Sequence, residues 1–129
     1  MNRALVAAGA INGAIAVAAG AFAAHALKSR LDARALEVFE TGARYQMYHA
    51  LAIVLCGLLA MTRPGQGWSG LGSAGAAGWT LQVGIVLFSG SLYALALTGV
   101  KGLGAVTPFG GVAFLVGWGW LAYSALTSR

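Results

Sequence analysis

Four long apolar segments separated by short polar stretches constrain this chain more than any other feature. They cover about residues 4–27, 45–61, 79–98 and 108–126. A helix needs about 20 apolar residues to cross a bilayer, and only helices or closed barrels satisfy their backbone hydrogen bonds there. No segment alternates with the period of two that a barrel strand requires. The sequence therefore predicts an all-α integral membrane protein with four transmembrane helices, in a single transmembrane domain over residues 1–129.

The overall composition agrees with a membrane location. Of the residues 59% are hydrophobic and 9% are charged, which is more apolar than soluble domains are. The net charge of +5 does not indicate nucleic acid, because the bases are scattered over loops and ends without a recognition motif. The first segment could be a cleavable signal peptide, but its apolar stretch is longer than a signal core. We expect a retained span and membrane lipids as partners.

The charged stretch "KSRLDARALEVFETGAR", residues 28–44, lies between the first two spans. Ser29 and Asp32 have the spacing of a helix capping box, and the following apolar residues recur on one face. This pattern predicts an amphipathic interfacial helix over about residues 29–43. Opposite charges are spaced for pairing across one turn, namely Lys28 with Asp32, Arg34 with Glu37, and Glu40 with Arg44.

Turn signals and short connections predict how the spans are joined. Pro64 and Gly65, which end the preceding helix, lie in a glycine-rich connection over residues 62–78, and Thr107 with Pro108 has the pattern of a helix N-terminus. Short connections favour two antiparallel hairpins in an up-and-down bundle. Five bases flank the spans on the side of residues 28–44 and three on the other, which favours termini outside the cytoplasm.

Polar and small residues inside the spans are the first candidates for a special role. Asn12 and Gln82 are amides within the first and third spans, where interhelical hydrogen bonds are the usual role and a polar path through the bundle is the alternative. Gly9, Gly13 and Gly20 give the first span a small-residue face, which predicts close helix packing.

A second group of polar residues gathers near the start of the second span, in "RYQMYHALAIVL". The candidate ligand pocket consists of His25, Arg44, Tyr45, Tyr48 and His49. An arginine could hold a head group while histidine and tyrosine form hydrogen bonds, and His25 with His49 could ligate a haem iron if they face one another. The alternative is that these residues are interfacial anchors, with each histidine bonded to a helix end or a tyrosine. No other metal site is expected.

Four blocks of the sequence resemble those of a known family. They are "GAFAAHALK" (20–28), "TGARYQMYHALAIV" (41–54), "GSLYALALTG" (90–99) and "TPFGGVAFLVGW" (107–118). In this order they resemble the small four-span membrane family called domain of unknown function 423, which is similar to human transmembrane protein 256. The resemblance implies a protein of the bacterial cytoplasmic (inner) membrane and no particular activity.

Three functional hypotheses follow from these residues. The favoured one is a structural or accessory membrane protein that packs as a homo-oligomer or within a larger membrane complex, without a cofactor. The alternative is a binder or carrier of a lipid, quinone or haem at the pocket described above, and the third is a small-molecule transporter. An enzyme is not expected, because the sequence lacks recognised catalytic motifs and the acids lie only in residues 28–44.

Overall fold

The computed structural model describes residues 2–61 and 74–127, and within these ranges the chain is helical without strands. The α-helices are α1 (Asn2–His25), α2 (Ala33–Met61), α3 (Ala74–Thr98) and α4 (Thr107–Thr127), with short 3-10 helices η1 (Leu27–Ser29) and η2 (Lys101–Ala105). This architecture confirms the prediction of an all-α chain.

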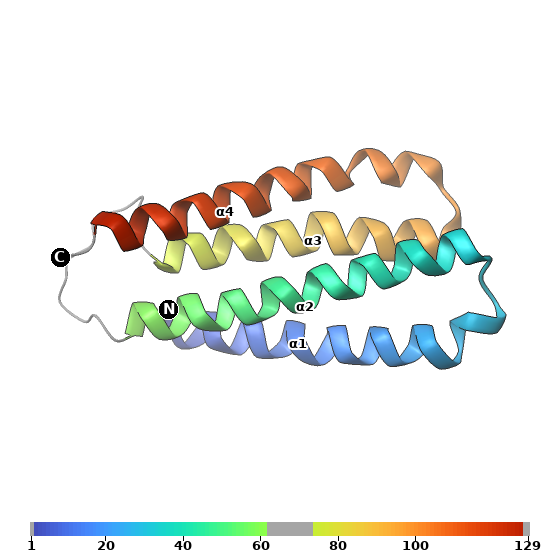
Figure 1. Cartoon of the computed structure of the whole chain (residues 1–129), viewed down its shortest axis with the longest axis horizontal. Coiled ribbons are helices and arrows are strands. Elements are labelled where there is room, and N and C mark those ends of the chain that lie inside the picture. The colour runs from blue at the N-terminus through green and yellow to red at the C-terminus, as the bar shows by residue number, and fades with distance from the viewer. Residues whose placement is uncertain (1, 62–73, 128–129) are drawn as a thin grey trace.

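The helices lie side by side and alternate in direction (Figure 1). The first turn of α1 and the last turn of α4 lie at one end, and the α1–α2 and α3–α4 connections lie at the other. α2 packs between α1 and α3, while α4 packs mainly on α3. An apolar core lies where these helices meet and includes the buried residues Leu5, Ile53, Leu81 and Phe114.

Three segments are long and apolar enough to cross a membrane. They are Arg3–His25, Ala74–Thr98 and Lys101–Thr127. α2 is longer than any of the other described helices but does not meet this measure, and its first half holds two of the three acidic residues of the chain, Glu37 and Glu40.

The prediction of a separate interfacial helix over residues 29–43 is wrong, because α2 continues without a break from Ala33 to Met61. The helix is capped by Asp32, whose Oδ1 accepts a hydrogen bond from the backbone N–H of Ala35 at 2.7 Å. Phe39 lies in a buried cluster with Leu27 of η1, Ala23 of α1 and Ala96 of α3. Burial of Phe39 holds this segment in the bundle, so it continues the line of the helix.

The three ion pairs predicted for residues 28–44 are also absent from the described structure. Arg44 Nη2 instead donates to Thr41 Oγ1 at 3.2 Å, and Thr41 donates to the backbone carbonyl of Glu37 at 2.9 Å. The charged side chains of α2 are therefore exposed, except for the half-buried Glu40, and they do not neutralise one another.

Of the three glycines predicted to pack helices, only Gly9 lies where an added Cβ would meet another described helix. A Cβ at Gly9 would lie 2.8 Å from the backbone nitrogen of Val54 and 2.9 Å from the carbonyl oxygen of Ala50. A Cβ at Gly13 or Gly20 would meet no atom within 4 Å. The buried residues of α1 are Leu5, Gly9, Asn12, Ala16 and Ala23, and Gly13 and Gly20 lie beside this row rather than in it.

The ends of α3 and α4 differ in detail from the sequence prediction. α3 begins at Ala74, so residues 74–78 of the predicted connection are helical, while Pro64 lies outside the described residues. α3 ends at Thr98. Gly99 follows with a φ of +70°, a left-handed conformation that glycine adopts without strain, and the Gly99 N–H donates to the Leu95 carbonyl at 2.8 Å. The Thr107 hydroxyl lies 2.6 Å from the Ser91 hydroxyl.

Candidate functional site

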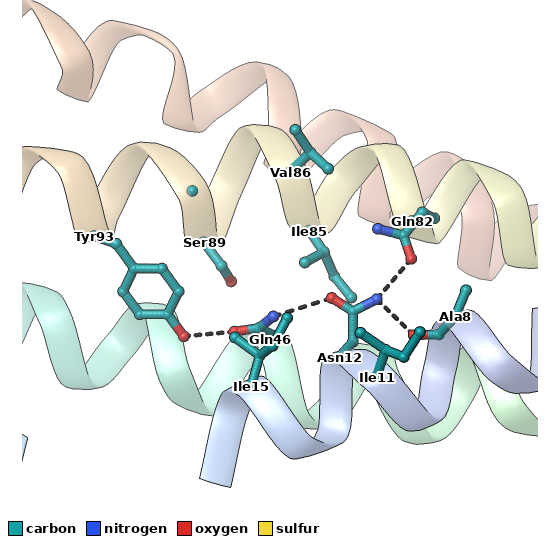
Figure 2. Close-up of a pocket in the computed structure, with 11 residues that line it drawn as sticks. Ala8, Ile11, Asn12, Ile15, Gln46, Gln82, Ile85, Val86, Ser89 and Tyr93 are labelled. Atoms are coloured by element: carbon teal, nitrogen blue, oxygen red, sulfur yellow. Dashed lines mark hydrogen bonds between the residues drawn. The ribbon is translucent and has the colours of Figure 1, made fainter. Parts of the chain in front are cut away.

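A groove of about 530 Å³ lies between α1 and α3, with α2 at its base (Figure 2). Its lining residues are Ala8, Ile11, Asn12 and Ile15 of α1, Gln46 of α2, and Gln82, Ile85, Val86, Ser89, Gly90 and Tyr93 of α3. The walls are largely aliphatic, and the polar side chains point toward one another across the base. This combination of apolar walls with a few convergent polar groups is typical of a small-molecule site.

Hydrogen bonds join four polar side chains of the groove into one chain across three helices (Figure 2). The Tyr93 hydroxyl donates to Gln46 Oε1 at 2.7 Å, and Gln46 Nε2 donates to Asn12 Oδ1 at 3.0 Å. Asn12 Nδ2 then donates to Gln82 Oε1 at 2.7 Å and to the backbone carbonyl of Ala8 at 2.8 Å. We call these four side chains, from Tyr93 to Gln82, the polar chain.

Close helix packing places the members of the polar chain. The tight approach of Gly9 to α2 brings Asn12, one turn later on α1, next to Gln46. On the other side, a Cβ at Gly42 would lie 3.0 Å from the ring of Tyr93. Glycine at this position therefore leaves room for Tyr93 to lie across α2 and reach Gln46. Asn12 and Gln46 are both buried.

The polar chain leaves one group available on the groove side. Gln82 is half-buried, and no hydrogen bond in the described structure uses its Nε2 donors. An amide N–H without an acceptor in apolar surroundings costs about 1–3 kcal/mol. None of the groove-lining residues carries a formal charge. The groove is therefore suited to an uncharged molecule that presents a hydrogen-bond acceptor to Gln82 and an apolar body to the walls.

The structure brings together only part of the pocket predicted from the sequence. The ring of Tyr45 lies 5.8 Å from that of Tyr48 and 6.1 Å from that of His49. His49 is buried and stacks on Phe114. Its Nδ1 lies 2.6 Å from the Tyr45 carbonyl, and its Nε2 accepts from Trp118 Nε1 at 3.1 Å. These contacts join α2 to α4.

His25 and Arg44 do not take part in that cluster. His25 is exposed at the last residue of α1, and Arg44 is exposed on the outer face of α2. His49 lies about 24 Å along α2 from its first residue. The expectation that the two histidines share one depth is therefore wrong, and the reason is the unbroken α2, which places His49 in mid-helix. In the described residues no group of three His, Cys, Asp or Glu side chains could hold a metal ion.

Sequence reasoning did not single out Gln46 and Tyr93, although both are polar residues within apolar helices. It did single out Asn12 and Gln82, and the structure joins these two directly. Gln46 lies within two residues of Tyr45 and Tyr48, and the sequence pattern assigns this whole polar group to the membrane surface without distinguishing Gln46. A rule that marks every amide inside an apolar helix would have found it.

Comparisons with known proteins were consistent with one another. The profile of the family described as "Protein of unknown function (DUF423)" matches residues 19–111. A UPF0382 membrane protein of Bacillus subtilis, YwdK, is 49% identical over 110 residues, which are 85% of each chain. A UPF0382 membrane protein of Haemophilus influenzae is 41% identical over 120 residues, which are 93% of this chain and 91% of the relative. No solved structure gave a significant match.

Proposed function

The chain belongs to the bacterial membrane protein family described as protein of unknown function (DUF423), and on that premise we propose that it binds a neutral, lipid-soluble carbonyl compound in the α1–α3 groove. The proposed role is non-enzymatic binding or carriage within the bacterial cytoplasmic membrane. The observation that carries the proposal is the unused amide donor pair of Gln82 above the polar chain.

The physical reason for this proposal is that lipid tails would surround the groove in a membrane. Lipid tails offer no hydrogen-bond acceptors, so an amide that faces them remains unsatisfied. A ligand carbonyl would accept a hydrogen bond from Gln82 Nε2, while Asn12 holds the Gln82 carbonyl in place. The ligand would thus gain a bond that lipid cannot supply, which gives the site selectivity over the surrounding bilayer.

Among the ligand classes suggested by the sequence, a quinone fits this groove best. It combines uncharged carbonyl groups with an apolar tail that would lie along Ile11, Ile15 and Ile85. An anionic lipid head group would need a cation, and none lines the groove. A bis-histidine haem would need two imidazoles facing one another, whereas His25 and His49 lie apart and the nitrogens of His49 are engaged within the bundle.

The proposal includes a fourth span formed by the second half of α2, about residues 45–61. Both ends of the described chain would then lie on one side of the membrane, outside the cytoplasm as the distribution of bases favours. Alkaline phosphatase is active only outside the cytoplasm, and green fluorescent protein fluoresces only inside it. We therefore expect alkaline phosphatase fused to the C-terminus to be active, and green fluorescent protein fused there not to fluoresce. Fusions after Lys101 should show the reverse pattern. The same pattern at both sites would show that α4 does not cross the membrane, and the same pattern for fusions after Lys28 and after Met61 would show that α2 does not cross it.

Filling the groove is expected to remove the ligand. Gly90 lines the groove, and a Cβ there would meet no atom within 4 Å, so Gly90→Leu would fill space without displacing a helix. We expect Gly90→Leu to bind a decyl-chain benzoquinone about tenfold more weakly than the parent, a loss of ~1.4 kcal/mol. Native mass spectrometry and quenching of tryptophan fluorescence in nanodiscs would measure the affinity.

A matched variant controls for the leucine itself. A Cβ at Gly119 on α4 would also meet no atom within 4 Å, and Gly119 does not line the groove, so the Gly119→Leu variant should bind the quinone as the unsubstituted protein does. Equal affinity of the parent and Gly90→Leu would overturn the proposal. Absence of any bound quinone in the parent, with saturating amounts present, would overturn it as well.

A further inference from the structure

The outer face of α2 carries a continuous row of side chains, which we call the α2 stripe. It consists of Glu37, Thr41, Arg44, Tyr48, Leu51 and Leu55, all exposed except the half-buried Thr41. The spacing alternates between four and three residues, which is the repeat of a helix-pairing seam. The half of the stripe toward the C-terminus of α2 is apolar, and Leu51 in that half is 64% exposed. The opposite face of α2, with Gln46 and Ile53, is the one that packs against the rest of the chain.

Contacts with α3 establish the depth of the charged half of this stripe. The Ser89 hydroxyl donates to the Gly42 carbonyl at 2.7 Å, and the ring of Tyr45 stacks on that of Phe88 at 4.7 Å. Arg44 is therefore level with residues 88–89, about 14 Å from the Thr98 end of α3. Half of a hydrocarbon core is about 15 Å thick. If α3 crosses the membrane, the backbone of Arg44 lies deep inside it.

Contacts with α1 give the same depth. Gln46 bonds to Asn12, which lies near the middle of α1, and Arg44 precedes Gln46 by about 3 Å of helix rise. An extended arginine side chain is roughly 7 Å long and is too short to reach the membrane surface from there. Charged side chains at such depth almost always face protein or water rather than lipid.

The charges of this region have little compensation within the chain. Arg44 Nη2 donates to Thr41, and among the described residues no ion pair is formed by Arg44, Glu37 or Glu40. A partner that packs on this face would therefore have to supply anions for Arg44 and a cation for Glu37 and Glu40. These partner charges would have to lie at nearly the same depth in the membrane. The α2 stripe and the adjacent Glu40 themselves present that combination of charges.

We propose that the α2 stripe is the interface between two copies of this chain, with α2 packed against α2. Two copies inserted in the same direction would be related by a two-fold axis along the membrane normal, so equal levels of the two stripes meet. Side chains of a helix lean toward its N-terminus, which brings the Arg44 guanidinium toward Glu40 and Glu37 of the second copy. Below this level Tyr48, Leu51 and Leu55 would interlock.

A second copy of the chain can pair the charges of the α2 stripe, whereas lipid tails cannot. An interface with two-fold symmetry needs a patch that complements itself, and both charge signs lie within one turn of α2. The inference depends on α1 and α3 crossing the membrane and is independent of any ligand in the groove. The sequence favours a structural or accessory protein that packs as a homo-oligomer, and the α2 stripe is the surface that we propose for this packing.

Disulfide cross-linking in native membranes tests the interface. Leu51→Cys is expected to give a covalent dimer as the main product after mild oxidation. Leu115→Cys on α4 is a matched control, since Leu115 is an exposed leucine away from the stripe, and it should give little dimer. The parent controls for Cys56, which is buried. Equal yields from Leu51→Cys and Leu115→Cys, or no dimer from Leu51→Cys, would overturn the proposal.

Charge exchange tests the pairing across the interface. Arg44→Glu is expected to raise the dimer dissociation constant at least about tenfold, and adding Glu40→Arg should recover most of the loss. Native mass spectrometry of the full chain in mild detergent would measure both values. If Arg44→Glu does not accumulate, Arg44→Gln is compared with the parent in the same way. An unchanged dissociation constant, or a parent that is monomeric in membranes and detergent, would contradict the proposal.

Discussion

Gly110→Ala is expected to lower the free energy of unfolding by ~2–3 kcal/mol, the largest single effect that we expect. Gly110 lies against the backbone of Phe88, where a Cβ would stand 2.7 Å from the Cα of Phe88. A backbone contact cannot be relieved by a side-chain rotation, so α3 and α4 would have to separate. Only Gly110, Phe114 and Gly117 are buried in α4, so the close contact at Gly110 is a large part of its packing on α3.

The neighbouring glycine provides the control for this prediction. A Cβ at Gly111 would meet no atom within 4 Å, and alanine is the better helix former, so Gly111→Ala should leave stability unchanged or slightly raised. Thermal unfolding of both variants in nanodiscs, followed by tryptophan fluorescence, would measure the difference. Similar transition temperatures for the two variants would show that α4 does not pack closely on α3 at Gly110.

Asn12→Leu is expected to cost ~2–3 kcal/mol, the second large effect. The substitution removes the acceptor for Gln46 Nε2 and the donor for Gln82 Oε1, so two amides lose partners in apolar surroundings. Ile15→Leu is a suitable control, because it changes another groove residue of α1 without touching the polar chain. The measurement is again thermal or denaturant unfolding in a constant lipid environment.

A double-mutant cycle distinguishes the loss of hydrogen bonds from a general disturbance of α1. Asn12→Leu and Gln46→Leu should be non-additive by ~1 kcal/mol, since the bond between these residues is lost in either single variant. Asn12→Leu and Ile15→Leu should add. Additive effects for Asn12 with Gln46 would mean that the polar chain does not contribute as a connected unit.

The error at residues 28–44 illustrates where the sequence stopped being sufficient. Its charges and its capping spacing are those of a surface helix, and the local pattern gave no reason to join it to the following span. The outcome depends on Phe39 and Gly42, which pack on α1 and α3. The separation of His25 from His49 follows from the unbroken α2 helix, so it could not be predicted while residues 29–43 were expected to form a helix of their own.

The sequence by itself determined that the chain forms apolar helices, and it did so for α1, α3 and α4 within a few residues at most ends. Backbone hydrogen bonds of a helix are local and hydropathy adds along the segment, so both can be assessed without tertiary contacts. It also marked Asn12 and Gln82, because amides are rare in such segments.

Only the tertiary structure decided which polar groups meet. The hydrogen bonds of the polar chain join residues that are 34, 47 and 70 positions apart. Whether such residues face one another depends on the rotation and the axial stagger of each helix. Both are set by close contacts such as those at Gly9 and Gly42, where the presence or absence of one methyl group determines how near two helices can come.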